Sequence, residues 1–175
     1  VPIKSVMANK DLIFTESDST KVKFFNTRKD ILVFTFTKAT REKRGYLLCL
    51  RKLTMVEHLE VAGLFLTEQQ HNERVDEQYD CSHLIQFNGD TIGTLKYKVW
   101  GSHIEIMQLQ IHPNHQNKGY GRGVIEQVIK TAQLKPIKLT VLKNNPAKAL
   151  YTRLGFKITE EDNYEYHMQT QPINN

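Results

Sequence analysis

The chain has 175 residues, of which 39% are hydrophobic and 25% are charged, the composition of a globular domain with a core of its own. Its apolar runs are far shorter than the ~18 residues that indicate a membrane span, and its first residues lack the apolar core of a signal peptide. The two cysteines, Cys49 and Cys81, have neither a metal-ligand spacing nor a disulfide framework, so we expect a cytoplasmic protein with reduced thiols.

The net charge of +5 is unevenly distributed. Residues 1–52 hold 12 Lys and Arg against 5 Asp and Glu, a net charge of +7, whereas residues 53–175 have a net charge of −2. A basic N-terminal part is able to contact nucleic acid or an acidic partner. Because no basic motif interleaved with aromatic residues appears there, a solvated basic surface is the favoured interpretation.

The N-terminal part reads as β-rich. Short strands are expected at residues 12–15, 21–25 and 31–37, the last of which is rich in β-branched and aromatic residues. The polar cluster Thr40–Gly45 is typical of a loop. We therefore expect an N-terminal β extension over residues 1–45, followed by the main domain over 46–175.

The next segment predicts a strand and then a helix. Tyr46–Leu53 alternates and is read as a strand, and Thr54 with Glu57 matches a capping box for a helix that continues to Leu66. The polar stretch Gln69–Asp80 is where that helix fades.

Three strands and a second helix are expected next. A hairpin joins residues 82–88 to 91–100 through the turn Asn88-Gly89-Asp90, and 104–111 is a further strand. Apolar residues at helical spacing then favour a helix over 124–132.

The C-terminal part alternates strands and a helix. Residues 137–142 read as a strand, Pro146 suits the first turn of a helix that Gly155 ends, and 156–159 and 164–169 close as strands. After the β extension the order is β-α-β-β-β-α-β-α-β-β, which indicates a mixed α/β domain with helices on the faces of a central sheet.

The most informative segment is Gln116-Asn117-Lys118-Gly119-Tyr120-Gly121. Two glycines one residue apart allow a tight turn, and the helix that follows directs its free N–H groups and positive dipole end toward that turn. Strand, glycine turn and helix N-terminus together predict an anion site, most often for phosphate or pyrophosphate. The alternative is a loop whose glycines only permit tight packing.

Two phosphate-binding motifs fit poorly. A P-loop ends in Gly-Lys-Ser/Thr, but Gly121 is followed by Arg122 and Gly123. A dinucleotide fold places an acidic residue ~20 positions further on, at the end of the next strand. Residues 138–142 of this chain read Lys-Leu-Thr-Val-Leu, without a carboxylate.

A third interpretation fits more of the chain. Leu109-Gln110-Ile111-His112-Pro113 with Gln116–Arg122 resembles the acetyl-CoA site of the GNAT family of N-acetyltransferases. A second block, from Asn144 through Tyr151 to Leu154-Gly155-Phe156, resembles that family's next motif. The resemblance covers residues 46–170 and implies the family's fold, in which a mostly antiparallel, splayed sheet is flanked by helices.

The resemblance also implies a cofactor site. The backbone of Leu109, Gln110 and Ile111 would bind the pantetheine arm of acetyl-CoA like an added strand. Backbone N–H groups of the turn would hold the pyrophosphate, helped by two basic side chains. The residues implied in the turn are Asn117, Lys118, Gly119, Tyr120, Gly121 and Arg122.

Three side chains are implied in the chemistry. Tyr151 matches a tyrosine that protonates the departing CoA thiolate, and Asn144 would orient the cofactor or a water. Glu105 matches the glutamate that serves as base in the histone-acetylating branch of the family. Glu105 alternatively faces solvent or binds a cationic substrate, and a water relay would replace it as base. The seven histidines are scattered, and none is preferred as the base.

The sequence thus predicts acetyl transfer from acetyl-CoA to a primary amine, in a ternary complex and without a metal. The acidic bias of the segment Glu68–Asp80 hints at a cationic acceptor. Two other functions remain as alternatives: a non-catalytic acyl-CoA-binding module, and nucleic-acid binding through the basic N-terminal part. Pairing of the N-terminal strands across a homodimer is a further expectation.

Overall fold

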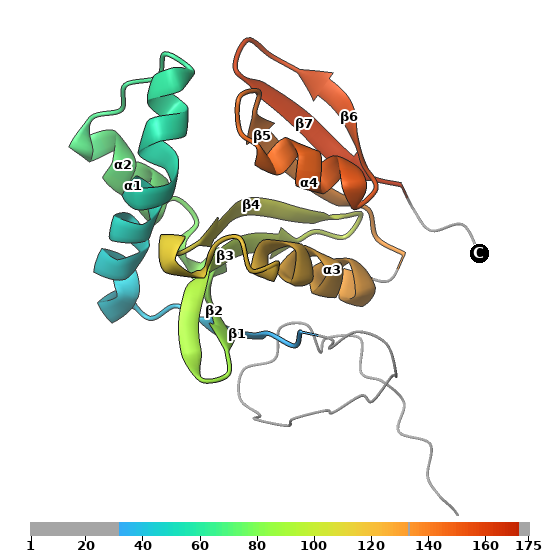
Figure 1. Ribbon diagram of the computed structural model, residues 1–175, viewed down its shortest axis with the longest axis horizontal. Helices are drawn as coiled ribbons and strands as arrows, with labels where there is room; N and C mark the ends of the chain where they lie inside the picture. The colour runs from blue at the N-terminus through green and yellow to red at the C-terminus, as the bar shows by residue number, and fades with distance from the viewer. Residues whose placement is uncertain (1–31, 133, 172–175) are drawn as a thin grey trace, which may run out of the picture.

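The computed structural model describes residues 32–132 and 134–171 (Figure 1). Short 3-10 helices lie at Arg41–Lys43, Tyr79–Cys81 and Pro113–His115. The other elements are, in chain order, β1 (Thr35–Lys38), α1 (Arg44–Val61), α2 (Glu68–Asp76), β2 (Ser82–Phe87), β3 (Asp90–Val99), β4 (Ile104–Ile111), α3 (Tyr120–Ala132), β5 (Ile137–Leu142), α4 (Ala147–Arg153), β6 (Phe156–Glu161) and β7 (Glu165–Thr170).

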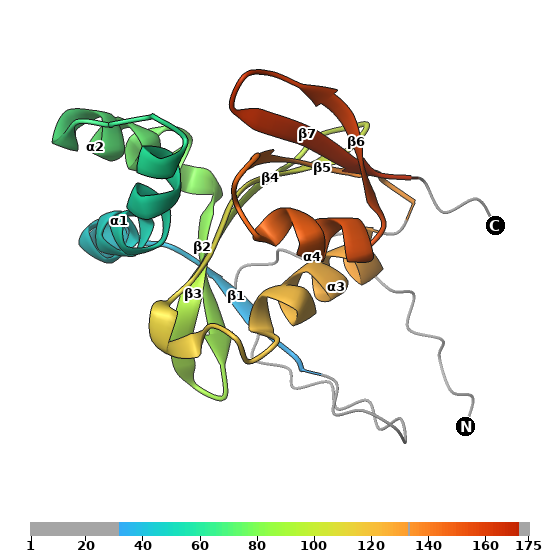
Figure 2. The same ribbon diagram turned by 45° about the horizontal axis from the view of Figure 1, so that its top comes forward.

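The strands form one sheet in the order β1-β2-β3-β4-β5-β7-β6. Every neighbouring pair in it is antiparallel except β4 and β5, which are parallel. Helices α3 and α4 lie side by side on one face, and α1 and α2 lie together on the other side of the molecule (Figures 1 and 2). The expected mixed α/β fold with a mostly antiparallel sheet is confirmed.

Side chains on successive residues of a strand enter two different cores, because they point to opposite faces of the sheet. Ile85 of β2 joins the main core with Val124, Ile125 and Val128 of α3. The preceding residue, Leu84, joins a second, smaller core with Leu47 of α1. Helices on both faces therefore bury the sheet.

The two middle strands of the sheet diverge. β4 pairs with β5 only over Ile104–Ile106 and Ile137–Leu139, although β4 continues to Ile111 and β5 to Leu142. Just beyond the last paired residue, the register between β3 and β4 shifts in a bulge, and a bulge bends and twists the strand that carries it. The splay expected for this sheet is thus present between β4 and β5.

The strand predicted at Tyr46–Leu53 is wrong, since these residues belong to α1. A short apolar run fits a strand or a buried helix equally well, and here Leu47, Leu50 and Arg51 are buried at the i, i+3, i+4 spacing of a helix. Thr54 is inside this helix rather than at its start, and its hydroxyl donates to the carbonyl of Leu50 at 2.8 Å.

The capping box belongs to a different helix. The Thr67 hydroxyl accepts from the N–H of Gln70 at 3.2 Å, and the Gln70 side chain accepts from the N–H of Thr67 at 2.8 Å. The polar stretch expected as a fading helix end contains α2, and Thr40–Gly45, expected as a loop, contains a 3-10 turn and the start of α1. Hydrophobic periodicity misses α2 because its apolar face is narrow: only His71 and Val75 are buried in it.

A buried lysine attaches α2 to the sheet. Lys96 of β3 is 4% exposed, and its ammonium donates to the carbonyls of Arg74, Val75 and Glu77 at 3.1, 3.2 and 2.6 Å. A cation at a helix C-terminus satisfies carbonyls that have no partner inside the helix.

The remaining elements follow the prediction closely. The β2–β3 hairpin turns through Asn88 and Gly89, which both have positive φ, as a type I′ turn requires. The strand expected over 31–37 lies at Thr35–Lys38 and forms the edge next to β2. The helix expected from residue 124 begins four residues earlier, at Tyr120. The strands expected at 12–15 and 21–25 lie outside the described residues.

Candidate active site

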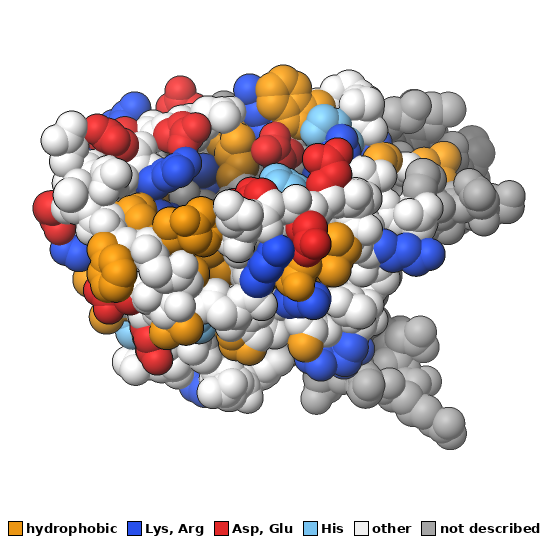
Figure 3. Space-filling model, turned by 90° about the horizontal axis from the view of Figure 1, so that it is seen from above, with side chains coloured by type: hydrophobic (Ala, Val, Ile, Leu, Met, Phe, Trp, Pro, Cys, Tyr) orange, Lys and Arg blue, Asp and Glu red, His pale blue; other side chains and the backbone are white. Residues whose placement is uncertain are grey.

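The divergence of β4 and β5 opens a cleft of about 1170 Å³. Its walls come from α1, α2, β4, β5 and the β6–β7 hairpin. Figure 3 shows this face of the molecule, with acidic side chains on both sides of the hollow. Among the predicted site residues, Glu105, Leu109, Gln110 and Tyr151 line the cleft.

The end of β4 offers backbone groups to this cleft. His112 donates its N–H to Ile92 of β3 at 2.9 Å, and N–H and C=O groups alternate in direction along a strand. The backbone groups of Leu109 and Ile111 therefore point away from β3, where β5 has already diverged, and those of Gln110 point toward β3. The Ile111 carbonyl accepts from the Gln116 side-chain amide at 2.9 Å, which leaves the backbone groups of Leu109 and the N–H of Ile111 for a ligand. This geometry suits an extended ligand that hydrogen-bonds like an added strand.

The glycine turn adopts the conformation that its sequence requires. Asn117 and Gly119 have φ values of 59° and 78°, a region that glycine adopts without strain and asparagine tolerates. Within the described part of the chain, the N–H groups of Lys118, Gly119 and Tyr120 have no acceptor. These donors and the first turn of α3 form an exposed anion site.

Close packing joins the two sequence blocks. A Cβ placed on Gly121 would lie 3.9 Å from Ile111 Cγ1 and 3.9 Å from Leu150 Cδ2. The end of β4, the start of α3 and the residue before Tyr151 thus meet at one point. A molecule held by the turn is positioned to extend along β4 toward Tyr151.

Two residues of the turn have structural roles. The Tyr120 ring packs against Phe34 and Phe87, with ring centroids 6.0 and 5.0 Å away. Arg122 pairs with Glu126 one turn further along α3, at 2.8 Å. Only the backbone of Tyr120 is therefore free for a ligand, whereas Arg122 can exchange its exposed ion pair for a phosphate at small cost.

Tyr151 has the environment expected of a proton donor. It is buried on α4 against Phe156, with ring centroids 5.7 Å apart. Burial raises the pKa of the Tyr151 phenol to about 12, because the charged phenolate would be poorly solvated. The phenol is therefore fully protonated at neutral pH.

Glu105 lies near the apex of the opening. It lies at the start of β4, within the three residues that pair with β5. Its carboxylate accepts from the Trp100 indole N–H at 2.9 Å. At a rise of ~3.3 Å per residue, Glu105 is about 13 Å along the strand from Leu109. Its strand neighbours are Lys98 and Lys138.

Asn144 does not line the cleft. Its side-chain amide donates to the carbonyl of His58 at the end of α1, at 3.0 Å, and so joins the β5–α4 loop to α1. The following residue, Asn145, caps α4 by accepting from the Ala147 N–H at 2.9 Å, and it does line the cleft. Through this hydrogen bond Asn144 supports the cleft wall, and its predicted role toward the cofactor stays a prediction.

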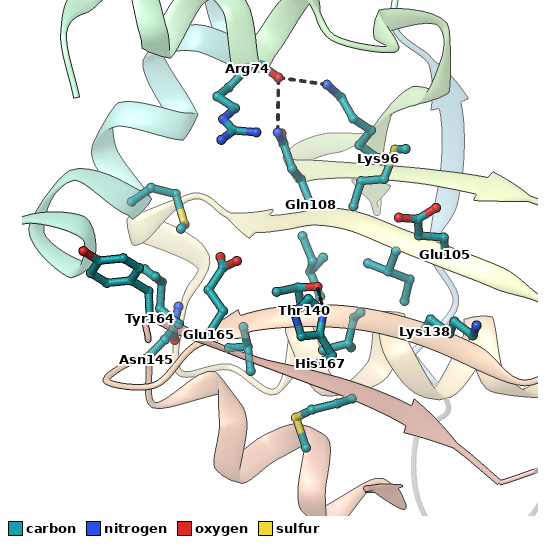
Figure 4. Close-up of a pocket in the computed structure, with 18 of the residues that line it drawn as sticks. Arg74, Lys96, Glu105, Gln108, Lys138, Thr140, Asn145, Tyr164, Glu165 and His167 are labelled. Atoms are coloured by element: carbon teal, nitrogen blue, oxygen red, sulfur yellow. Dashed lines mark hydrogen bonds between the residues drawn. The ribbon is translucent and has the colours of Figure 1, made fainter. Parts of the chain in front are cut away.

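The cleft also contains residues that the sequence did not single out as a group (Figure 4). His167 of β7 lies 3.2 Å from the Thr140 hydroxyl through Nδ1 and 3.8 Å from the Asp162 carboxylate through Nε2. On the opposite wall, Gln108 donates to the Arg74 carbonyl at 3.4 Å. No periodicity marks these positions, since they come from separate elements and only the tertiary fold brings them together.

The sequence model of the acetyltransferase (GNAT) family matches residues 48–156. This chain belongs to the GNAT acetyltransferase family. The matched range extends from α1 to the first residue of β6, so it contains the glycine turn, the diverging strands and Tyr151.

One curated relative of the chain is the UPF0157 protein YqkA of Bacillus subtilis (strain 168). It is 35% identical over 75 residues, which is 42% of this chain and 22% of that protein. The chain thus matches about a fifth of the length of this relative.

Solved structures of several acetyltransferases share the fold. An acetyltransferase of Thermus thermophilus superimposes with a TM-score of 0.65 at 18% identity, over 82% of this chain and 99% of that one. The PaiA N-acetyltransferase of Thermoplasma acidophilum, solved in complex with coenzyme A, gives 0.60 at 17% identity over 80% and 99%. Naa50 of Arabidopsis thaliana, in complex with a bisubstrate analogue, gives 0.53 at 15% over 79% and 98%.

Over residues 32–132 and 134–171, none of the helices combines the length and apolar composition of a membrane span. In the same ranges, no three His, Cys, Asp or Glu side chains are grouped as ligands for a metal ion. Cys49 and Cys81 are free thiols, and Cys49 is exposed.

Proposed function

We propose that this protein transfers the acetyl group of acetyl-CoA to a primary amine. The observation that carries the proposal is an exposed anion turn packed against the end of β4, together with a cleft that Leu109 of β4 and the buried Tyr151 both line. Membership of the GNAT acetyltransferase family supports the same reaction.

Some groups of the chain bind the acetyl donor, and others take part in the reaction. N–H groups of Lys118, Gly119 and Tyr120 hold the pyrophosphate of the donor, and the backbone of Leu109 with the N–H of Ile111 holds its pantetheine arm. Fixing donor and acceptor side by side removes much of the entropic barrier, which is worth ~7–11 kcal/mol in well-oriented reactions.

In the reaction, the neutral amine attacks the thioester carbon, the C–N bond forms and the C–S bond breaks. Tyr151 donates a hydrogen bond to the departing thiolate. A phenol with a pKa of about 12 is a weaker acid than a thiol, whose reference pKa is about 8.5. Tyr151 therefore acts mainly by stabilising the developing negative charge, and its proton follows as the thiolate leaves.

The attacking amine must also lose a proton. Glu105 is the proposed acceptor of that proton, because its carboxylate lines the cleft and is fixed by the Trp100 indole. A relay through water remains the other route, and it needs no carboxylate.

A thiol-release assay with acetyl-CoA and a panel of primary amines and short peptides tests the proposal. We expect amine-dependent release of CoA thiol and acetylated product by mass spectrometry. Because Cys49 is exposed and reacts with thiol reagents, the control is the enzyme with acetyl-CoA and no amine. Tight CoA binding without product from any amine would favour the non-catalytic acyl-CoA-binding module instead.

A further inference from the structure

Arg51 of α1 is a buried arginine without a partner among the described residues. It is 7% exposed and lines the cleft. Its guanidinium Nε is enclosed and has no hydrogen-bond partner, and no carboxylate in the described ranges forms an ion pair with it. By contrast, Arg44 on the same helix binds Asp76 through two hydrogen bonds of 2.7 Å.

The surroundings of Arg51 make its charge costly. Burial and the nearby Arg74 guanidinium both lower the pKa of Arg51, yet arginine stays charged in proteins. The acidic side chains that line the cleft in α2 and at its C-cap are engaged elsewhere: Glu73 accepts from Gln69 at 2.8 Å, and Glu77 pairs with Arg74 at 3.5 Å. A buried cation is stable only when it is paired.

The free donors of Arg51 face the cleft. Of its guanidinium nitrogens only Nε is enclosed without a partner, so the terminal nitrogens reach the open space that Arg51 lines. Arg74 projects into the same space near Gln108, opposite Glu165 and His167 (Figure 4). One wall thus presents the Arg51 and Arg74 guanidinium groups beside the engaged carboxylates of Glu73 and Glu77, and the other presents carboxylates and an imidazole.

We infer that Arg51 binds a carboxylate of the acceptor, so that the acceptor is a small amine that also carries a carboxylate group. This inference rests on the proposed function and names its substrate class. The planar guanidinium offers two parallel N–H donors that match a carboxylate. The acceptor's amino group then lies toward the acidic β6–β7 wall. An anionic group on the acceptor replaces the cationic acceptor that the acidic composition of Glu68–Asp80 suggested.

Matched substrates test the inference through activity. β-Alanine carries a carboxylate where β-alaninamide carries a neutral amide. The amine of β-alaninamide is the less basic of the two, so a larger fraction of it is neutral and able to attack. β-Alaninamide should therefore be the better substrate unless the enzyme binds the carboxylate. We expect β-alanine to be the better substrate. Arg51→Met should lower kcat/KM for β-alanine about 10- to 100-fold, the effect of losing hydrogen bonds to a charged group, and leave β-alaninamide unaffected.

Further variants test whether the effect depends on the guanidinium at residue 51 or on positive charge in general. Arg51→Lys should recover part of the preference, because a point charge remains while the two-donor geometry is lost. Arg153→Met removes a positive charge from the exposed surface of α4 and should leave both substrates unchanged. Equal loss for both substrates in Arg51→Met, or a preference for the amide in the wild type, would overturn the inference.

Binding of the product gives a readout that does not depend on turnover. In calorimetric titration, N-acetyl-β-alanine should bind the wild type and bind Arg51→Met at least 10-fold more weakly, whereas N-acetyl-β-alaninamide should not distinguish the two proteins. Absence of binding to the wild type would refute the anion site whatever the amine panel gives. Binding that Arg51→Met abolishes, without any acetylation, would retain the site and reject the proposed function.

Thermal unfolding of Arg51→Met tests whether its loss of activity comes from a folding defect. Replacing a buried unpaired charge by an apolar side chain of similar length is neutral or stabilising. Arg51→Met should therefore keep or raise the melting temperature. A lower melting temperature would show that Arg51 has a partner in the folded protein and would contradict its role as an open anion site.

Discussion

The hydroxyl group of Tyr151 is the proposed hydrogen-bond donor to the departing thiolate. Tyr151→Phe removes only that group and keeps the packing against Phe156. We expect kcat to fall about 100-fold, at the lower end for loss of a general acid, while the affinity for CoA stays within twofold. Stopped-flow measurement of thiol release checks this.

The control for this variant is Tyr166→Phe, on β7, where the ring stacks under Lys143 and Lys148 rather than lining the cleft. It should keep full activity. The pH profile adds a second check: with a pKa of about 12 for Tyr151, its deprotonation cannot cause any loss of activity between pH 8 and about 10. An unchanged rate in Tyr151→Phe would refute its role.

Glu105 distinguishes a protein base from a water relay. Glu105→Gln keeps an oxygen that accepts the Trp100 N–H but cannot take a proton. If Glu105 is the base, kcat/KM at neutral pH should fall about 100-fold, and the loss should shrink as rising pH supplies free amine. Steady-state assays from pH 6.5 to 9.5 measure both effects, and a rate within twofold of the wild type would favour the relay.

At the level of elements, the turn before α3 depends on a backbone that only glycine adopts freely. Gly119 has a φ of 78° and no heavy atom within 4 Å of the position of a Cβ. Gly119→Ala should therefore cost roughly 1–2 kcal/mol of stability through backbone strain rather than through a clash. The shifted turn should also weaken CoA binding, because its N–H donors would no longer converge.

A matched glycine separates these two effects. Gly89 in the β2–β3 hairpin has a φ of 92° and equally open surroundings, and it is not part of the turn before α3. Gly89→Ala should cost a similar free energy of unfolding in urea but leave CoA affinity unchanged by calorimetry. Equal CoA affinity in the two variants would contradict the anion site at the turn.

Elements also differ in how far local sequence specifies them. The β2–β3 hairpin is specified by Asn88-Gly89, because a type I′ turn accepts few other residues. Helix α1 is not, because the short apolar run around Leu47 fits a strand or a helix until the packing of Leu47 with Val75 and Leu84 selects the helix. Helix α2 depends on Lys96, which lies on β3 and follows the carbonyls that it binds by 19 to 22 residues.

At the level of the whole molecule, burial of histidines predicts how stability depends on pH. His71 of α2 is 5% exposed. Its pKa is lowered first by burial and then by Arg51 and Lys52, with Glu68 opposing. The pKa of His83 on β2 is lowered mainly by burial as well. Both side chains therefore fold in the neutral form.

The difference in histidine pKa between the folded and unfolded states sets the direction in which stability changes with pH. Protonation favours the unfolded chain, in which histidine has a pKa of about 6.5, so the stability is complete above that value and is lost as pH falls from 6.5 toward the folded pKa. The carboxyl groups of Asp76 and Asp162 also have lowered pKa values, but their contribution is lost only below about pH 4. The window from pH 7.5 to 5 thus isolates the histidines.

Calorimetric melting in this window is the measurement. The wild type should lose melting temperature as the pH falls, and His71→Gln should show a shallower slope, with the remainder due to His83. Parallel curves for the two proteins would mean that His71 does not differ in protonation between the folded and unfolded states.

The sequence by itself determined the parts of the site that one segment forms. The turn at Asn117 and Gly119, the start of a helix behind it and the tyrosine seven residues after Asn144 are local patterns, and local backbone conformation encodes them. The family resemblance rested on the same two blocks, and the match to residues 48–156 confirmed it. The assignments of Glu105, Tyr151 and Asn144 to catalytic and binding roles remain predictions.

The tertiary structure alone decided what surrounds the reaction. The cleft exists because β4 and β5 part after three paired residues, and no local pattern records where two strands diverge. Arg51 appeared in the sequence as one polar residue of an expected strand. Arg51 indicates an acceptor site only because α1 places its guanidinium at the cleft without a partner among the described residues. The cost of a buried charge depends on neighbours that are distant in the chain, so the sequence alone does not reveal it.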